Sequence, residues 1–117
     1  GRERLPLIAE QAPMGEAILR MTESGFGVAG VTDGGGGLVG VITDGDLRRH
    51  MDGLMDRIAA EVMTRGPQTI GPDALAERAV QIMNARKVTC LFVVDPEGSR
   101  NAVGLLKIHD CLRAGVG

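Results

Sequence analysis

Three glycines in the first half of the chain have the spacing of a phosphate-binding loop. Gly35, Gly37 and Gly40 form G-x-G-x-x-G within the stretch DGGGGLVGVITDGD. In a dinucleotide-binding fold, such a loop joins a strand to a helix whose N-terminus binds the pyrophosphate. Here the apolar residues 38–42 follow the loop and predict a strand instead. We therefore expect a hairpin turn, in which glycine supplies positive φ at little cost.

A threonine and an aspartate follow that predicted strand with the spacing of a helix capping box. Thr43 precedes Asp46 by three residues at the expected start of a helix. In a capping box, each of the two side chains bonds the other residue's backbone N–H. The same groups can also bind a ligand, because a carboxylate accepts two hydroxyl donors and a helix start favours a phosphate. The two roles do not exclude each other, and the pattern leaves both open.

The segment around Asp46 occurs a second time near the end of the chain. Residues 40–49 (GVITDGDLRR) align with residues 104–113 (GLLKIHDCLR) at an offset of 64. Upstream, residues 21–33 (MTESGFGVAGVTD) align with residues 83–95 (MNARKVTCLFVVD) at an offset of 62. The chain is therefore a repeat whose second copy has a longer turn. Lys107 and Asp110 occupy the positions of Thr43 and Asp46.

The same order of elements is predicted in both copies: a short extended piece, a helix, two strands and a final helix, or β-α-β-β-α. The predicted core strands are 28–32, 38–42, 91–94 and 103–106. In the second copy, residues 73–86 have helical spacing, with Asp73 as the N-cap candidate. The final helices are expected to begin near Asp46 and Asp110.

The predicted fold class is α/β (α+β), with two small repeats packed by pseudo-two-fold symmetry. We place the first repeat at residues 1–56 and the second at residues 57–117, with a short linker around residues 53–58. In the first copy, Met14 and Met21 have the spacing of a buried helix face, and most of the six methionines are expected to fill the core.

The composition argues against several classes of protein. The net charge of −2 gives no electrostatic footprint for nucleic acid. The chain has no Trp or Tyr and only 2 Phe, so it lacks platforms for base stacking. No apolar run approaches the roughly 18 residues that a membrane helix needs. We therefore expect neither a nucleic-acid partner nor a membrane partner.

The nucleophilic and metal-ligating residues form no pattern of their own. Cys90 and Cys111 lack the spacing of a metal or redox pair, which favours a reducing compartment, the cytoplasm. His50 and His109 stand apart from any plausible set of metal ligands or catalytic partners. We expect no metal, and no acid, base and nucleophile constellation within this chain.

The doubled unit resembles a tandem pair of CBS domains, or Bateman module. The resemblance rests on VTDGGGGLVGVITDGDL, on VVDPEGSRNAVGLLKIHDCL and on EVMTRGPQTI at residues 61–70, and it covers nearly the whole chain. It implies two related clefts between the repeats, one beside Thr43 and Asp46 and the other beside Lys107 and Asp110. It also implies a homodimer formed through CBS pairs.

A narrower resemblance is to the C-terminal part of bacterial D-arabinose 5-phosphate isomerases. The segments GVITDGDLRRHMD, EVMT and HDCLRAGVG carry it. Those enzymes join a sugar-isomerase domain to a CBS pair and serve the synthesis of Kdo, a lipopolysaccharide sugar. The isomerase domain is missing here and the first repeat is clipped at Gly1. We therefore expect a piece of a longer, tetrameric aldose-ketose isomerase, and no catalytic role passes to any residue of this chain.

The resemblance to CBS pairs also implies a set of ligand contacts. In nucleotide-binding pairs, the residues that match Thr43 and Asp46 contact phosphate and ribose hydroxyls. The further candidates are Arg48, Thr69, Thr89, Lys107 and Asp110. Most have an ordinary alternative: Arg48 as a surface residue, the two threonines as strand formers, and Lys107 as a solvated lysine, which we favour.

Two functions follow from the resemblance. The first is a regulatory module that binds a nucleotide or nucleotide-sugar, such as CMP-Kdo or an adenine nucleotide, and needs no other cofactor. The second is an architectural module that holds isomerase subunits together and binds no small ligand. The sequence leaves open the identity of the ligand and whether both clefts are used.

Overall fold

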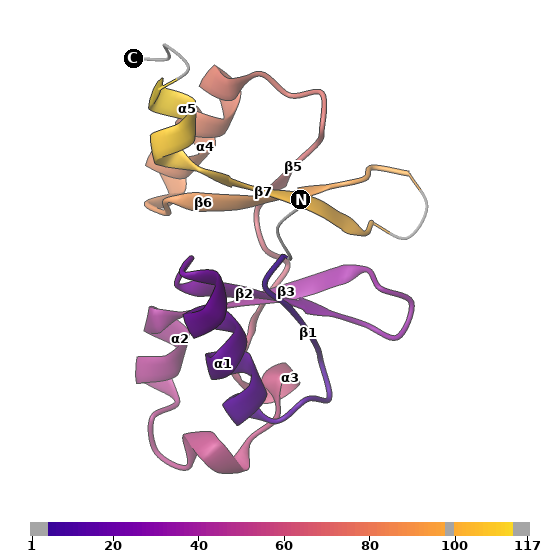
Figure 1. The fold of residues 1–117 in the computed structure, drawn as a ribbon, viewed down its shortest axis with the longest axis vertical. Helices are drawn as coiled ribbons and strands as arrows, with labels where there is room; N and C mark the ends of the chain where they lie inside the picture. Colours follow the sequence, from indigo (N-terminus) through magenta and orange to yellow (C-terminus); the bar gives the residue numbers. More distant parts are fainter. Residues whose placement is uncertain (1–4, 98–99, 114–117) are drawn as a thin grey trace. The chain divides into compact units, whose positions relative to one another are not determined.

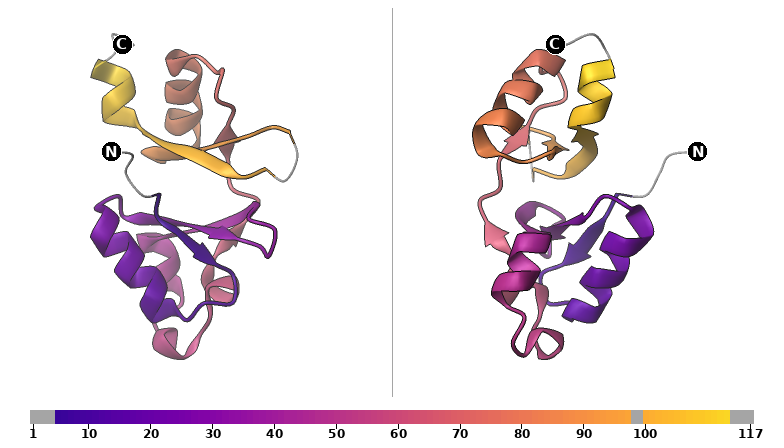
Figure 2. Two further views of the ribbon diagram at one scale, coloured as in Figure 1. Left: turned by 45° about the vertical axis from the view of Figure 1, so that its right-hand side comes forward. Right: turned by 90° about the vertical axis from the view of Figure 1, so that its left-hand side faces the viewer.

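The computed structural model describes residues 5–97 and 100–113. The chain forms two compact units that divide after Pro67. Each unit combines a small β-sheet with helices, as the ribbon in Figure 1 and the two further views in Figure 2 show. The mixed α/β fold class predicted from the sequence is confirmed.

The first unit is built on a sheet with strand order β1-β2-β3-β4. Its strands are β1 (Leu7–Ala9), β2 (Val28–Thr32), β3 (Leu38–Thr43) and β4 (Thr64–Arg65). Strand β1 runs parallel to β2, and the other two pairings are antiparallel. The helical segments are α1 (Met14–Ser24), α2 (Asp44–Arg49), a 3₁₀ turn (Leu54–Asp56) and α3 (Ala59–Val62). Helices α1 and α2 cover the same face of this sheet in the views of Figures 1 and 2.

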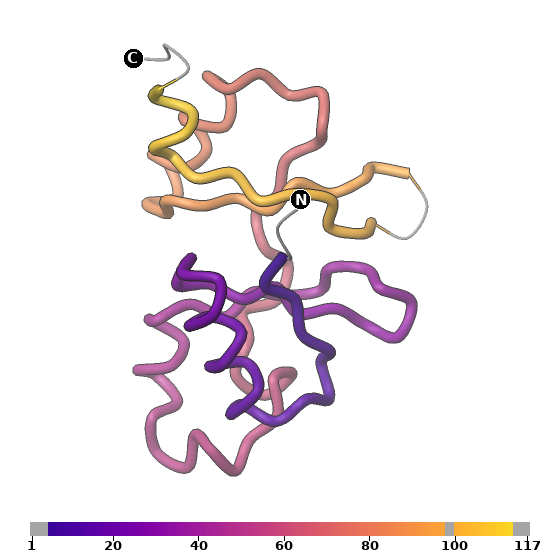
Figure 3. Tube along the Cα trace, viewed as in Figure 1, coloured from indigo at the N-terminus to yellow at the C-terminus, as the bar shows by residue number. Residues whose placement is uncertain are grey.

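The second unit repeats this plan. Within its described residues, β5 (Thr69–Ile70), β6 (Cys90–Val94) and β7 (Ala102–Lys107) form a sheet in the order β5-β6-β7. Its helices are α4 (Ala76–Arg86) and α5 (Ile108–Arg113), and both lie on one face of the sheet in Figure 1. The tube in Figure 3 traces the same path from helix to hairpin to final helix in each unit.

The strand ladders repeat residue by residue. Val28 pairs with Thr43 at one end of the first hairpin, and Cys90 pairs with Lys107 at the matching end of the second. Each ladder carries a register shift near its far end, between Val31 and Thr32 and between Val93 and Val94. The internal duplication seen in the sequence is therefore present in the backbone pairing.

The glycine-rich stretch forms the hairpin turn that the sequence predicts. The Asp33 carboxylate accepts hydrogen bonds from the backbone N–H groups of Gly35 and Gly37, both at 2.9 Å. Gly36 has a φ of 89°, which a side chain would strain. A strand follows at Leu38, so these glycines join two strands and do not present phosphate-binding groups at a helix start.

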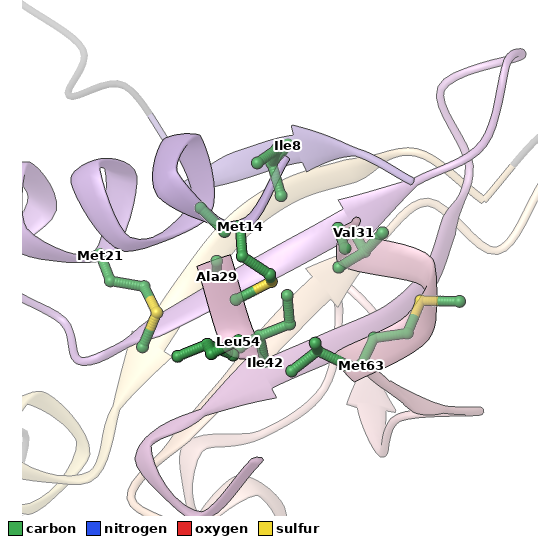
Figure 4. Close-up of a cluster of buried hydrophobic side chains, with 11 residues drawn as sticks. Ile8, Met14, Met21, Ala29, Val31, Ile42, Leu54 and Met63 are labelled. Carbon is green, nitrogen blue, oxygen red and sulfur yellow. The ribbon is translucent and has the colours of Figure 1, made fainter. Parts of the chain in front are cut away.

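Methionine and aliphatic side chains fill the space between helices and sheet. Figure 4 shows the first core, where Met14, Met21 and Met63 lie among strand residues such as Ile42. In the second unit, Met83 packs in the equivalent core. The expectation that methionines fill the core is confirmed for these four, whereas Met51 and Met55 are exposed.

The N-cap predicted for the fourth helix is wrong. Helix α4 begins at Ala76, its N-cap is Leu75, and no side chain caps it. Asp73 instead lies in a turn that the Ala74 N–H closes onto the Gly71 carbonyl at 3.2 Å. The Pro-Asp pair at the centre of this turn favours turn geometry over a helix start. The final helices also begin two residues earlier than expected, at Asp44 and Ile108.

The segment expected as a linker is folded onto the first unit. Leu54 is buried in the first core, and Ile58 forms a β-bridge with Pro13. The Ala59 N–H donates to the Ala12 carbonyl at 2.8 Å. The chain passes between the compact units only after Pro67. The boundary of the sequence repeat after residue 56 stays a prediction.

Candidate functional site

The junction between β3 and α2 contains the predicted capping box. Thr43 is the N-cap of α2, with extended backbone angles of φ −121° and ψ 174°. Its side-chain oxygen accepts from the Asp46 N–H at 3.4 Å, and its own N–H donates to Asp46 Oδ2 at 2.9 Å. Thr43 and Asp46 therefore form the capping box that their spacing predicts, and these bonds fix where the Asp46 carboxylate points.

Asp46 is the only buried charged residue in the part of the chain that the structure describes. Its Oδ1 accepts from Arg49 at 2.6 Å and from the Thr64 hydroxyl at 2.7 Å. Its Oδ2 accepts from the Thr43 N–H and from the Thr43 hydroxyl, the latter at 3.1 Å. Burial raises the pKa of Asp46, but the bonds from Thr64, Thr43 and Arg49 outweigh it and hold the pKa below its ordinary value.

A glycine in β3 allows the last of these donors to come close. A Cβ on Gly40 would lie 2.5 Å from the sulfur of Met63 and 3.0 Å from the Thr64 carbonyl oxygen. Only glycine therefore accommodates β4 against β3 at this distance. Because β4 pairs with β3 at Val41 and Thr64, the Thr64 hydroxyl reaches the Asp46 carboxylate.

The equivalent junction in the second unit is more open. The Asp110 side chain is 49 % exposed, against 3 % for the Asp46 side chain. Among the described residues, only the Arg113 guanidinium donates to the Asp110 carboxylate, and it is itself 80 % exposed. The structure thus leaves about half of the Asp110 side chain in contact with water.

Lys107, Thr89 and Cys90 surround the start of α5. Lys107 pairs with Cys90 across the β6–β7 ladder, and the Thr89 carbonyl accepts from the Ile108 N–H at 2.9 Å. Burial raises the pKa of the Cys90 thiol, and the Thr89 hydrogen bond and the Lys107 charge only partly oppose that effect. The structure therefore brings Lys107, Thr89 and Asp110 to one end of the second hairpin.

The two remaining candidates, Thr69 and Arg48, have other surroundings. Thr69 is half-buried in β5, and its hydroxyl accepts from Arg100 at 3.4 Å. Arg48 is exposed on α2, whereas Arg49 makes the ion pair with Asp46. From the sequence, Arg49 was weighed with Arg48 as a surface residue that could contact an anionic ligand, and no role was predicted for Thr64. Spacing of i, i+3 was a signal for Arg49, but the Thr64 contact spans 18 residues and had none.

Other kinds of site find no support in the described residues. Residues 5–97 and 100–113 hold no group of three or more His, Cys, Asp or Glu side chains that could bind a metal ion. His50 lies with its Nδ1 3.0 Å from the Asp46 backbone carbonyl. No helix within these same ranges is long and apolar enough to cross a membrane.

The duplicated β-α-β-β-α unit is matched by a known family model. The model for the CBS domain matches twice, at residues 2–53 and 59–117. The chain belongs to the CBS domain family. The pair of repeats described above is therefore a pair of CBS domains, and Asp46 and Asp110 mark the same position in each.

Curated relatives match almost the whole chain. The arabinose 5-phosphate isomerase KdsD of Pseudomonas aeruginosa is 39% identical over 117 residues, which are 97% of this chain and 35% of that protein. The KdsD isomerase of Yersinia pestis is 36% identical over 115 residues, and an uncharacterized protein of Rickettsia prowazekii, RP505, is 35% identical over 115 residues. The chain thus spans about a third of the length of these relatives.

Solved structures share the fold at lower identity. A crystal structure of CBSX2 in complex with AMP has a TM-score of 0.78 at 22% identity, covering 95% of this chain and 87% of that one. The CBS domain pair of protein MJ0100, in complex with 5′-methylthioadenosine and S-adenosyl-L-methionine, has a TM-score of 0.81 at 22% identity, covering 97% and 90%. These likenesses confirm the fold of a CBS pair.

Proposed function

We propose that this CBS pair is the regulatory part of an arabinose 5-phosphate isomerase. The observation that carries the proposal is identity of up to 39% to such isomerases along 97% of the chain. The relatives extend well beyond the matched region, which leaves room for a separate sugar-isomerase domain. In this proposal the isomerase acts in the cytoplasm and serves the synthesis of Kdo, and the parent protein is a tetramer assembled through CBS pairs.

The ligand that we propose is a nucleotide or nucleotide-sugar. Two structural neighbours carry adenosine compounds, namely AMP in one and 5′-methylthioadenosine with S-adenosyl-L-methionine in the other, which supports an adenine nucleotide. CMP-Kdo is the second candidate, because an activated form of the pathway's sugar is a suitable feedback signal. Both candidates offer a ribose diol, which a carboxylate binds well, and phosphate groups, which cations bind well.

The end of the second hairpin best fits this chemistry. Asp110 offers a half-exposed carboxylate to the ribose hydroxyls, and the guanidinium of Arg113 lies beside it. Lys107 brings an ammonium group to the same end of the sheet. Thr89, beside them, stays in the proposed set of contacts. Thr69 also stays a proposed contact. Thr43, Asp46 and Arg48 stay proposed contacts for a ligand that displaces a donor from the Asp46 carboxylate.

Regulation requires that the ligand favours one arrangement of the protein over another. A ligand with equal affinity for two conformations shifts nothing, however tightly it binds. In the proposal, the nucleotide binds one conformation of the CBS pair more tightly and thereby biases the isomerase domain. The coupling is reciprocal, so substrate bound to the isomerase domain changes the affinity for the nucleotide by the same factor.

Calorimetric titration of the chain with CMP-Kdo, CMP, AMP and ATP tests the proposal. We expect heat of binding with at least one of them and its loss in Asp110→Asn. Asp73→Asn is the matched control, because it makes the same chemical change at an exposed residue of a turn in the same unit. The absence of heat with all four compounds at millimolar concentration would contradict ligand sensing.

An architectural role is the second candidate, and the burial of Asp46 favours it. All of the hydrogen bonds that this carboxylate accepts come from within the chain, so its position is explained without a ligand. Sedimentation and activity of the full-length protein with Asp46→Ala and Asp110→Ala decide between the two roles. Loss of the oligomer and of activity, with no effect of any ligand on the unmodified protein, would favour architecture.

A further inference from the structure

The two aspartates at equivalent positions of the CBS repeats, Asp46 and Asp110, differ in the hydrogen bonds that their carboxylates already accept. A carboxylate offers about four acceptor positions. Asp46 uses them on four bonds from three residues, Thr43, Arg49 and Thr64. A ligand diol can therefore bind Asp46 only by displacing one of these donors.

Thr64 differs from the other donors in where it comes from. Thr43 and Arg49 lie within three residues of Asp46 and belong to the capped helix itself. Thr64 comes from β4, 18 residues further along, and its 2.7 Å bond is made by a neutral hydroxyl, the group that a ribose would present. This bond is therefore not part of the Thr43–Asp46 capping box.

The second repeat has no such donor among the described residues. Within residues 5–97 and 100–113, its aspartate, Asp110, accepts from Arg113, and that guanidinium is largely in water. At Asp110 a diol therefore competes with the Arg113 guanidinium, a partner that water already reaches.

We propose that Thr64 closes the first CBS repeat to ligand hydroxyls, so that nucleotide binding is confined to Asp110 in the second repeat. The inference rests on the proposed function, because it presumes a ligand with a ribose diol. It makes Thr64 the residue that determines how many nucleotides the chain binds.

Binding of AMP to four variants tests the closure. We expect one AMP per chain in the unmodified protein and a loss of affinity of about tenfold or more in Asp110→Asn, since bonds to a charged group are lost. Adding Thr64→Val to Asp110→Asn removes the competing hydroxyl and restores binding. Adding Thr64→Ser does not restore it, because serine keeps the hydroxyl.

Two results of this titration would overturn the proposal. One is full affinity for AMP in Asp110→Asn, which would mean that the ligand uses Asp46 despite Thr64. The other is failure of Thr64→Val to restore binding. If the unmodified chain binds no AMP, the proposed function fails for this ligand. Gain of binding in Thr64→Val alone would then still support closure, and no gain would count against it.

A measurement without any ligand separates the closure from the proposed function. The carboxyl carbon of Asp46 can be followed by nuclear magnetic resonance during an acid titration. Thr64→Val is expected to raise the pKa of Asp46, because it removes a hydrogen bond to the ionised form, while Thr64→Ser leaves the pKa nearly unchanged. An identical pKa in all three proteins would show that Thr64 does not occupy the carboxylate and would refute the proposal.

Discussion

The two strand–helix junctions of this chain share a backbone and differ in chemistry. Each places an aspartate at the third residue of a six-residue helix that directly follows a paired strand. In the first, the carboxylate is buried and fully bonded, and in the second it is half in water with one exposed partner. Duplication has therefore preserved the pairing register while the environment of the repeated side chain has diverged.

Two local differences account for this divergence. Thr43 in the first repeat donates two bonds to its aspartate, and the second repeat has Lys107 at that position, which cannot form the same cap. The first repeat also carries β4, which Gly40 admits against β3 and which supplies Thr64. A structural carboxylate and a candidate ligand contact can thus occupy equivalent positions of one fold.

The largest effect on stability is expected when each of the two aspartates is replaced by alanine. Asp46→Ala leaves the Thr43 N–H and the Thr64 hydroxyl without their acceptor and should lower the free energy of unfolding by about 2–4 kcal/mol. Asp110→Ala, at an exposed site, should change it by less than about 0.5 kcal/mol. Chemical unfolding followed by circular dichroism measures both, since the chain has no Trp. Equal losses would mean that the two carboxylates are equally structural.

A smaller effect is expected at the glycines of β3 and β7. Gly40→Ala places a methyl group 2.5 Å from the Met63 sulfur and 3.0 Å from a backbone oxygen, so β4 must shift, at a cost of about 1–3 kcal/mol. At Gly104 the nearest atoms belong to Val93, at an ordinary contact distance of 3.6 Å. Gly104→Ala should therefore be neutral or slightly stabilising. The same unfolding measurement applies, and a comparable loss at Gly104 would contradict this account of β4.

Much of the fold follows from local patterns in the sequence. The hairpin strands were predicted within a residue or two at their ends because short apolar runs, repeated at the two sequence offsets, mark them twice. The Thr43–Asp46 capping box was also visible, because both partners lie within one turn of helix. Asp73 misled the prediction because the preceding proline favours a turn.

The parts of the site that the sequence could not supply depend on contacts between distant segments. The bond from Thr64 exists because β4 returns to pair with β3, and no periodicity in the sequence predicts a two-residue strand. The sequence did not show which of the adjacent Arg48 and Arg49 pairs with Asp46, since that depends on how α2 is oriented. Burial of Asp46 is likewise a property of the assembled unit rather than of the residue's own neighbourhood.

The smallest of the three effects is the contribution of Asp46 to the pH dependence of the unfolding free energy. Because the pKa of Asp46 is lowered in the folded chain, the unfolded chain takes up this proton first as the pH falls. The contribution of Asp46 is complete above the ordinary aspartate pKa of about 3.9 and is lost as the pH falls below that value through the lowered pKa. Each unit of lowering corresponds to about 1.4 kcal/mol. Unfolding free energies measured from pH 7 to pH 3 should therefore fall less steeply for Asp46→Asn than for the unmodified chain.

Asp110→Asn is the control for the loss of stability between pH 7 and pH 3. It makes the same chemical change at a half-exposed carboxylate outside the Asp46 network, and so tests whether a change of slope is specific to Asp46. If Asp46→Asn and the unmodified chain lost the same stability between pH 4 and pH 3, the Asp46 network would not favour the ionised form. The contrast between the two repeats would then reduce to solvent exposure alone.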